Sequence, residues 1–454
     1  MQTDTLKRRL RGSLITQFDP GHSGACDALV WNGRKPARRA RLIVRAACAD
    51  DVAEAVRFAA ENGLTVSPRG GGHHMSGIAA QADMVIDLGA LDGLKIDPDR
   101  RTARVGPAVT NARMSAALAR HDLAFPVGHC GSVPMSGYLL GGGIGWNSGA
   151  WGVACFLVDA VEVVMADGRI LTASDAENAE VFWAARGAGP AFFGIITAYH
   201  LRLMQAPKAI LSKVHVYPLV EAATIAAWAE TAMAEAPANI ELTLKIAAPP
   251  PGVPVKGPLV EAIATVFAGG DDEAHATLLR LFAQAPAAMQ VIGPMPTPFD
   301  VLDSLTAQAM PEGLRYGVDS LWSDARLPEV VQRIAEGMTT APSARSLALV
   351  MLRSPQAVAP GIGAFSRIGR IFGSVYAIWE DAGEDSAQLA WLRATIAAAA
   401  PICLGAYVGE ADLELGSGGL STHTPAAAAR LRDLATRFDP AGILAPTARN
   451  RAAA

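Results

Sequence analysis

The first part of the chain alternates short apolar runs with one amphipathic stretch. From Asp51 onward, apolar residues recur at helical spacing, Asp51 and Glu54 form a capping box, and Asn62-Gly63 ends the pattern, which predicts a helix between them. Apolar runs of strand length lie at residues 41–44, 64–66, 84–88, 160–165 and 193–203, and a hairpin pattern lies at 94–105. This alternation predicts mixed helix and strand structure.

The pattern changes beyond about residue 206. A proline-rich loop lies at 249–258, and alanine-rich stretches of helical composition lie at 222–236, 272–285, 328–338 and 386–400. A last helix is expected over 426–438, where Asp439-Pro440 ends it. Because 454 residues exceed one ordinary core, we expect a second α+β domain from 206 to about 420.

Composition narrows the class of protein. Of the 454 residues, 51% are hydrophobic and 18% are charged, which indicates a globular chain. The net charge of −4, without a long run of either sign, argues against a nucleic-acid groove or a basic membrane face. No apolar run reaches the roughly 18 residues that a membrane helix needs. Because the N-terminus has no apolar signal region, we expect a cytoplasmic protein.

The cysteines are scattered, and one of them stands apart. They lie at positions 26, 48, 130, 155 and 403, which predicts neither a disulfide framework nor a zinc site. Cys130 lies among glycines, a serine and a histidine, whereas the others fit small buried hydrophobes. A metal site would need His73, His74, His129 and Cys130. That alternative is weaker, because ligands adjacent in sequence rarely meet one ion well.

A run of three glycines, Gly70, Gly71 and Gly72, separates Arg69 from the pair His73-His74. Such a backbone has no Cβ atoms, so its N–H groups can form a nest for a diphosphate, to which Arg69 adds a fixed charge. A simple tight turn is the competing interpretation. NAD has weak support, because the G-x-G-x-x-G spacing is missing here and position 146, after Gly141 and Gly143, is a tryptophan.

Both glycine-rich segments resemble signatures of flavoenzymes similar to berberine bridge enzyme, within the larger vanillyl-alcohol-oxidase/PCMH group. Residues 69–77 resemble R-x-G-G-H-x-x-x-G, and residues 128–145 match G-x-C-x-[ST]-V-x-x-x-G-x-x-x-G-G-G-x-G without a gap. The resemblance implies an α+β, two-domain PCMH-type FAD-binding fold whose substrate domain is an antiparallel sheet covered by helices. It also implies FAD bonded twice, through its 8α-methyl to His73 and through C6 to Cys130.

The same resemblance implies cofactor-binding residues and domain limits. The residues expected to bind FAD are His73, Cys130, Arg69, Gly70, Gly71, Gly72, His74, Gly77, Gly128, Gly131, Ser132, Val133, Gly137, Gly141, Gly142, Gly143, Gly145 and Ile195. Residues 1–205 are expected to form the FAD-binding domain and 206–424 the substrate-binding domain. Residues 425–454 are expected to return to the FAD-binding domain, because Phe438-Asp439-Pro440 resembles the family's closing segment.

Three residues are candidates for catalysis: Tyr407, Glu410 and Tyr138. Residues 405–408 resemble the family's G-x-Y-x-N-Y strand, which faces the flavin, but Gly409 and Glu410 replace its Asn and second Tyr. Glu410 serves as a base if an apolar pocket raises its pKa, and otherwise it is a solvated loop acid. Tyr138 stands where the family often has His, and we expect it to support the pyrimidine or ribityl side of the flavin.

The activity implied is that of an FAD-dependent oxidase. It would oxidise an alcohol of a small organic or secondary-metabolite substrate, with O2 as acceptor and H2O2 as product. Val133 occupies the position at which a side chain of the family controls access of O2 to the flavin. By the resemblance, valine at this position indicates that O2 can reach the flavin. A carbohydrate, amine or C–C bond-forming oxidase and a non-catalytic flavin-binding protein are the alternatives. Few aromatic residues in the second domain favour a hydrophobic substrate over an oligosaccharide. A monomer or homodimer is expected.

Overall fold

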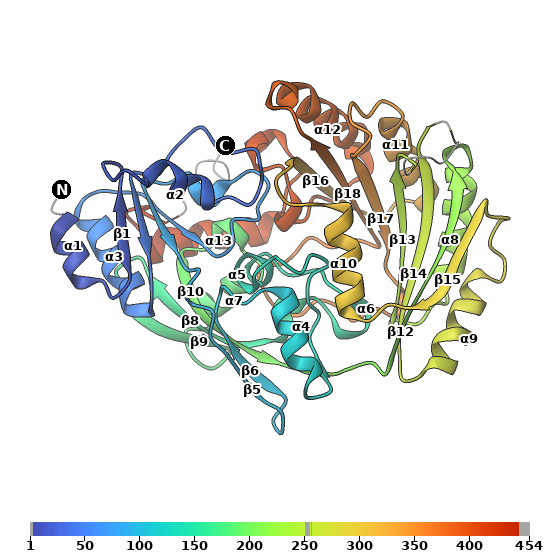
Figure 1. Ribbon diagram of the computed structural model, residues 1–454. Coiled ribbons are helices and arrows are strands. Elements are labelled where there is room, and N and C mark those ends of the chain that lie inside the picture. Colours follow the sequence, from blue (N-terminus) through green and yellow to red (C-terminus); the bar gives the residue numbers. More distant parts are fainter. Residues whose placement is uncertain (1–2, 250–254, 256, 445–454) are drawn as a thin grey trace.

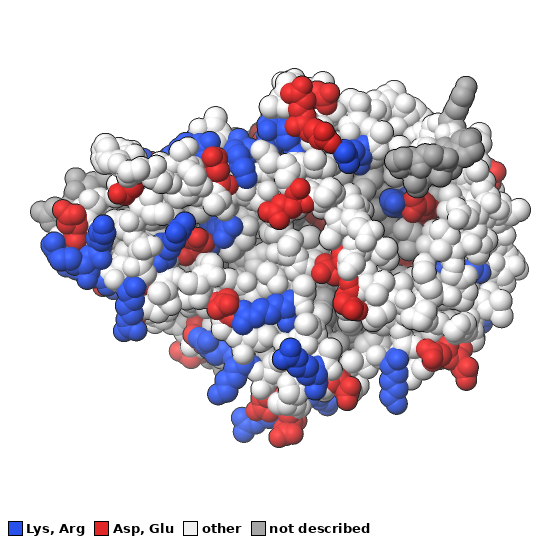
Figure 2. All heavy atoms as spheres, in the orientation of Figure 1, with Lys and Arg blue, Asp and Glu red and all other residues white. Residues whose placement is uncertain are grey.

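The computed structural model of the protein describes residues 3–249, 255 and 257–444. Its strands form a small mixed sheet, two larger antiparallel sheets and a two-stranded pair. Figure 1 shows the largest sheet with its helices on the right and the other sheets on the left. Positive and negative side chains are interspersed on the face in Figure 2, without a field of a single sign. The α+β class expected from the sequence is confirmed.

The mixed sheet has four strands in the order β1-β2-β4-β3. Strands β2, β4 and β3 run parallel, and β1 joins β2 antiparallel. Three helices accompany this sheet near the N-terminus. The elements are α1 (Thr3–Arg9), β1 (Ser13–Thr16), α2 (His22–Ala28), β2 (Leu42–Arg45), α3 (Ala49–Glu61), β3 (Val66–Arg69) and β4 (Met84–Asp87). The chain leaves β3 directly into the first glycine run.

The five-stranded sheet has the order β5-β6-β10-β8-β9 and packs beside the second glycine-rich segment. Its strands are β5 (Leu94–Asp97), β6 (Thr102–Val105), β8 (Val158–Met165), β9 (Ile170–Ser174) and β10 (Gly194–Arg202). The helices between them are α4 (Asn111–Ala119), α5 (Met135–Leu140), α6 (Ser148–Trp151) and α7 (Ala179–Ala185). Strands β7 (Leu123–Ala124) and β11 (Met204–Gln205) form the separate pair.

The seven-stranded sheet is antiparallel throughout, in the order β15-β12-β14-β13-β17-β18-β16. Its strands are β12 (Ala209–Pro218), β13 (Ile240–Ala247), β14 (Leu259–Ala268), β15 (Gln290–Pro296), β16 (Arg315–Ser323), β17 (Leu347–Leu352) and β18 (Ile371–Trp379). The helices are α8 (Ala222–Met233), α9 (Asp271–Phe282), α10 (Phe299–Ala309), α11 (Leu327–Met338) and α12 (Asp385–Ala399).

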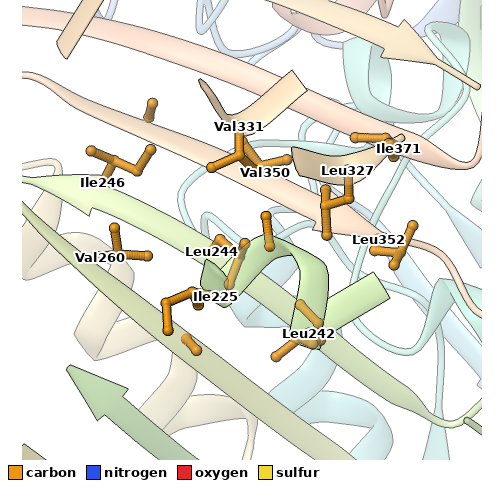
Figure 3. Close-up of a cluster of buried hydrophobic side chains, with 14 of the residues drawn as sticks. Ile225, Leu242, Leu244, Ile246, Val260, Leu327, Val331, Val350, Leu352 and Ile371 are labelled. Carbon is orange, nitrogen blue, oxygen red and sulfur yellow. The ribbon is translucent and has the colours of Figure 1, made fainter. Parts of the chain in front are cut away.

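Helices α8, α9, α11 and α12 cover one face of this sheet, which we call the outer face. In Figure 3, Ile225 of α8 and Leu327 and Val331 of α11 lie over apolar strand residues such as Leu244 and Val350. Because side chains alternate along a strand, the residues between these apolar ones point to the opposite, inner face. The inner face contacts the glycine-rich segments of the first half of the chain.

The last helix, α13 (Pro425–Phe438), packs back into the first half of the chain. Leu431 and Leu434 join the core of the five-stranded sheet, and the ring of Phe438 stacks on Phe193 at 5.3 Å. After the helix, Leu444 forms a parallel bridge to Val66 of β3. The C-terminal segment therefore contacts the first half of the chain, as expected. The domain limits at residues 205 and 424 stay predictions.

One sequence prediction about α3 is wrong in its detail. The helix begins at Ala49, after Cys48, so Asp51 lies inside the first turn instead of capping it. The Asp51 side chain is only 1% exposed. Its carboxylate accepts hydrogen bonds from the N–H groups of Arg11, Gly12 and Ala47, at 2.8, 2.9 and 2.8 Å. The residue predicted to cap the helix is therefore a buried carboxylate, which links the segment before β1 to the segment after β2 by hydrogen bonds.

Replacing Asp51 with Ala tests this role. The change leaves three backbone N–H groups without an acceptor in a buried place, so we expect the free energy of unfolding to fall by about 3 kcal/mol. Chemical denaturation followed by tryptophan fluorescence measures it. The matched control is Asp50→Ala, because Asp50 is exposed and its ion pair with Arg11 is long, at 3.7 Å. Equal stability of the two variants would contradict the role given to Asp51.

Candidate functional site

The loop after β3 presents unused backbone donors. Within the described chain, the N–H groups of Gly71, Gly72 and His73 donate to no other backbone carbonyl. Gly72 has a φ of +69°, and a Cβ atom there would lie 1.9 Å from the carbonyl oxygen of Leu29, so glycine is required. Successive free N–H groups of this kind form an anion-binding nest, which suits a diphosphate.

The side chain of Arg69 holds this loop through hydrogen bonds to backbone carbonyls. Its guanidinium donates to the carbonyl oxygens of Leu29, Ala28, Gly70 and Gly71 at 3.1–3.4 Å, and it pairs with Asp87 at 3.2 Å. These five contacts use all of its donors. The structure thus gives Arg69 a role in shaping the nest, whereas direct contact with a diphosphate stays a prediction.

His73 lies at the end of the same loop. Its ring stacks on Trp31, with centroids 5.0 Å apart. Burial and the nearby positive charge of Arg69 lower the pKa of His73 to about 4, against a smaller opposing effect of the hydrogen bond that the ring donates to the backbone carbonyl of Ser132. The imidazole is therefore neutral at physiological pH. One ring nitrogen is used by Ser132, and the other keeps its lone pair.

Cys130 reaches the same place from the second glycine-rich segment. Its Sγ lies 3.3 Å from the Oγ of Ser132, the residue whose carbonyl accepts from His73. Asn111 donates to the Cys130 carbonyl at 3.0 Å, and Asp303 of α10 accepts from the N–H of Gly131 at 2.6 Å. The two residues expected to carry FAD are thus brought together around Ser132, although they are 57 positions apart (130 − 73).

The second glycine run serves packing more than ligand contact. The hydroxyl of Tyr407 accepts from the N–H of Gly143 at 3.1 Å, and it also accepts from the N–H of Ile144. A Cβ atom at Gly142 would lie 2.5 Å from the ring of Phe365. Gly141 and Gly142 donate their N–H groups to carbonyls of the preceding helix, and a Cβ at Gly145 would lie 2.2 Å from the Tyr138 hydroxyl. This run therefore lets the two halves of the chain approach closely.

Tyr138 and Tyr407 are both buried, at 7% and 5% exposure. The Tyr138 hydroxyl donates to the carbonyl of Pro126, and burial raises the pKa of that hydroxyl well above its usual value. Burial likewise raises the pKa of Tyr407, and the charge of Glu410 adds to the effect. Each hydroxyl forms hydrogen bonds with backbone groups, so the geometry favours structural roles for both tyrosines.

Glu410 lies in the short 3-10 turn Val408–Glu410, over the inner face of the seven-stranded sheet. Burial raises the pKa of its carboxyl group; the hydroxyls of Tyr376 and Ser374 and the charge of His129 oppose this rise less strongly. Within the described chain, Glu410 Oε2 and Ser374 Oγ are buried without a hydrogen bond of ordinary geometry. A buried carboxylate oxygen and a buried hydroxyl without well-formed hydrogen bonds are expected where a ligand completes the site.

The structure adds a pair that the sequence prediction missed. His129, next to Cys130, has its Nε2 3.4 Å from Oε2 of Glu241, and its ring packs on Trp146 at 4.1 Å. The other oxygen of Glu241 accepts from the N–H of Asn147 at 2.6 Å. Glu241 belongs to β13, where polar residues alternate with Leu242 and Leu244. That alternation was the available signal for a polar inner face.

The remaining residues that were predicted to bind FAD lie around His73 and Cys130 or pack in the structure that supports them. His74 contacts the carbonyl of Val408 at 3.4 Å, Val133 accepts from the N–H of Asn111, and Gly137 has open space around it. Gly77 and Gly128 pack against Pro36 and Tyr138, and Ile195 is fully buried in β10. Among the residues that the structure describes, no group of three or more His, Cys, Asp or Glu is arranged for a metal, and no helix could span a membrane.

The residues fit FAD. A nest of free N–H groups suits its diphosphate, and His73, Cys130 and exposed Ser132 meet where the ring system would attach. The unsatisfied carboxylate oxygen of Glu410 lies over the facing sheet. The site therefore combines a nest of backbone N–H groups, two candidate attachment residues and a buried carboxyl group.

Comparison with known proteins supports FAD as the cofactor. Residues 40–174 match the model of the FAD binding domain family. The FAD-linked oxidoreductase nodO of Hypoxylon pulicicidum is 28% identical over 387 residues, which are 84% of this chain and 85% of that protein. The crystal structure of 6-hydroxy-D-nicotine oxidase from Arthrobacter nicotinovorans has a TM-score of 0.82 at 24% identity, covering 96% of each chain.

Berberine bridge enzyme from Eschscholzia californica has the same fold. Its structure has a TM-score of 0.82 at 19% identity and covers 97% of this chain and 96% of its own. The resemblance seen in the two glycine-rich segments, and the PCMH-type fold that it implied, are therefore confirmed. With its FAD-binding domain and its similarity to FAD-linked oxidoreductases along most of its length, the chain is an FAD-linked oxidoreductase, and its fold is that of berberine bridge enzyme.

Proposed function

We propose that this protein is an oxidase that holds FAD by covalent bonds to His73 and Cys130 and oxidises an alcohol of a small organic substrate to a carbonyl, with O2 as acceptor. The observation that carries the proposal is the meeting of His73 and Cys130 around Ser132, opposite a buried carboxyl group whose pKa is raised by burial. When bound, FAD accepts the hydride from the carbinol carbon.

Both attachment residues are in a suitable chemical state. His73 is uncharged because its pKa is lowered to about 4, so one ring nitrogen has a free lone pair for bonding to the 8α-carbon. Trp31 fixes the plane of that ring by stacking on it. Cys130 is only half-buried, and its backbone is held by Asn111 and by the contact of Gly131 with Asp303. Both side chains are therefore positioned before any cofactor is bound.

Glu410 is the base in this proposal. It accepts the hydroxyl proton of the alcohol while the hydride leaves the neighbouring carbon, and burial makes its carboxylate more basic than usual. Ser320 holds the turn that carries Glu410, because its hydroxyl accepts from the N–H of Tyr407 at 3.1 Å. The two electrons and the hydrogen of the hydride, together with the proton held by Glu410, convert O2 to H2O2, and Glu410 returns to its carboxylate form. Tyr138 and Tyr407 support the site without transferring a proton.

The covalent attachment is tested by acid precipitation. We expect a yellow pellet from the wild type, and a single flavin linking the His73 and Cys130 peptides on mass mapping. His73→Ala and Cys130→Ala should each keep one bond, and the double variant should release all flavin to the supernatant. Cys155→Ala is the control, because that thiol is fully buried. Flavin released from the wild type would remove this part of the proposal.

Glu410→Gln keeps the size of the side chain and removes its basicity. We expect the rate of anaerobic flavin reduction by an alcohol to fall by about 10²–10⁴-fold. Because a protonated carboxyl group cannot accept a proton, the wild-type rate should rise with pH through a pKa above the usual carboxyl range, and the variant should lack that step. Glu273→Gln on α9 is the matched control. Full activity of Glu410→Gln would exclude Glu410 as the base.

Val133→Leu tests the use of O2. By resemblance, a bulkier residue at this position restricts oxygen access. We expect the return of oxidised flavin absorbance, after dithionite reduction and mixing with air, to slow by about tenfold or more, which corresponds to ~1.4 kcal/mol. Reduction by the alcohol should change little. A wild-type enzyme that stays reduced in air would instead indicate a dehydrogenase.

A further inference from the structure

The inner face of the seven-stranded sheet carries one polar row across five strands. The ladder registers place Glu261 beside Lys245, Lys245 beside Leu349, Leu349 beside Ser374, and Ser374 beside Ser320. All five point away from the helices, because their neighbours along each strand belong to the outer core. They therefore form a continuous line from β14 to β16 on the side that faces the glycine-rich segments.

Two apolar clusters border this row. On one side Val318, Leu347 and Tyr376 pack with Trp31 and Met75. On the other side Trp322 and Phe372 pack with Tyr407, and Met351 packs against the same cluster. Each cluster joins the sheet to the half of the chain that carries His73 and Cys130. The row thus runs as a strip between two regions where the sheet contacts the first half of the chain, and Leu349 in its middle packs against the first cluster.

Burial changes steadily along the row. Ser320 and Ser374 are fully buried at one end, beneath the segment that carries Glu410. Leu349 in the middle is partly exposed, and the side chains of Lys245 and Glu261 at the far end are 24% and 22% exposed. The strip is therefore closed at the proposed base and open at the ion pair.

The spacing follows from the sheet. Adjacent strands lie about 4.8 Å apart, so Lys245 is about 10 Å from Ser374, with only Leu349 between them in the row. The neighbouring inner residues of β17 and β14, Met351 and Ile263, are also apolar and partly exposed. The strip thus offers a carboxyl group at one end, an aliphatic middle, and a charged pair at the other end.

The ion pair of Lys245 and Glu261 leaves one N–H group of Lys245 for a ligand. Nζ of Lys245 lies 3.0 and 3.2 Å from the two carboxylate oxygens of Glu261, which uses two of its three N–H groups. Lys245 is the one cation at an inner position of the described strands, since Lys213 of β12 lies over the ring of Phe282 in the outer core. A partly exposed cross-strand ion pair adds little to stability.

We propose that Lys245 and Glu261 form the distal recognition site for the substrate, and that they select an elongated molecule with an apolar middle and a neutral hydroxyl or amide about 10 Å from the carbon that is oxidised. This inference rests on the proposed function, because it uses Glu410 as the reacting end. A neutral group accepts from the free N–H of Lys245 and donates to Glu261. A carboxylate on the substrate would be repelled by the negative charge of Glu261, and an ammonium group would be repelled by the positive charge of Lys245.

Charge swapping gives a direct test. The probes are octane-1,8-diol, 8-hydroxyoctanoate, 8-amino-1-octanol and 1-octanol, and their dissociation constants are measured with the flavin-loaded enzyme by calorimetry. We expect the wild type to bind the diol about tenfold more tightly than 1-octanol. Glu261→Gln frees Lys245 and should make 8-hydroxyoctanoate the best probe, by about tenfold over the diol. Lys245→Met frees Glu261 and should favour the amino alcohol to the same extent.

Glu329→Gln is the matched control, because Glu329 makes an ion pair with Arg333 on α11, which covers the outer face. It should leave the order of probes unchanged. The same order of probes in the wild type and in both inner-face variants, or no binding of the diol, would overturn the inference. Flavin reduction is recorded separately. Switched binding without reduction by any probe would support the recognition site while counting against the proposed oxidation.

Discussion

The seven-stranded sheet has two faces, and the burial of one face fixes what the other can carry. Four helices cover the outer face, so most of the strand residues that point to it are Leu, Val, Ile or other apolar residues. The intervening positions are released from packing against helices, and they hold Glu241, Lys245, Glu261 and Ser374. The chemistry proposed for the site depends on this division, because a sheet packed against helices on both faces would be apolar on both.

The two halves of the chain meet through contacts that each support a residue of the site. Glu241 lies beside His129, next to Cys130; Asp303 holds Gly131; and Tyr407 accepts from the N–H groups of Gly143 and Ile144. The same approach of the halves buries Glu410 and raises its pKa. The proposed cofactor attachment and the proposed proton transfer thus depend on one interface, in which glycine allows a close backbone approach.

The sequence predicted the local elements well and the long-range contacts poorly. Alanine-rich stretches marked α8, α9, α11 and α12 closely, because composition and apolar spacing act over a few turns. The start of α3 was missed, since Asp51 has capping chemistry but serves N–H groups of Arg11 and Gly12, about 40 positions away. His73 and Cys130 were predicted from motifs alone, whereas Asp303, Glu241 and Tyr376 carry no local pattern that points to a flavin site.

The bond between Asp303 and Gly131 has a consequence for modular engineering. It joins a helix of the second half to the residue that follows Cys130, across 172 positions of sequence. The FAD-binding half therefore does not form a self-contained cassette. A chimera that joins it to the sheet of a relative would need an acceptor at position 303 and a hydroxyl at 407. The replaceable part is the inner face, whose alternate positions can vary without disturbing the helices behind them.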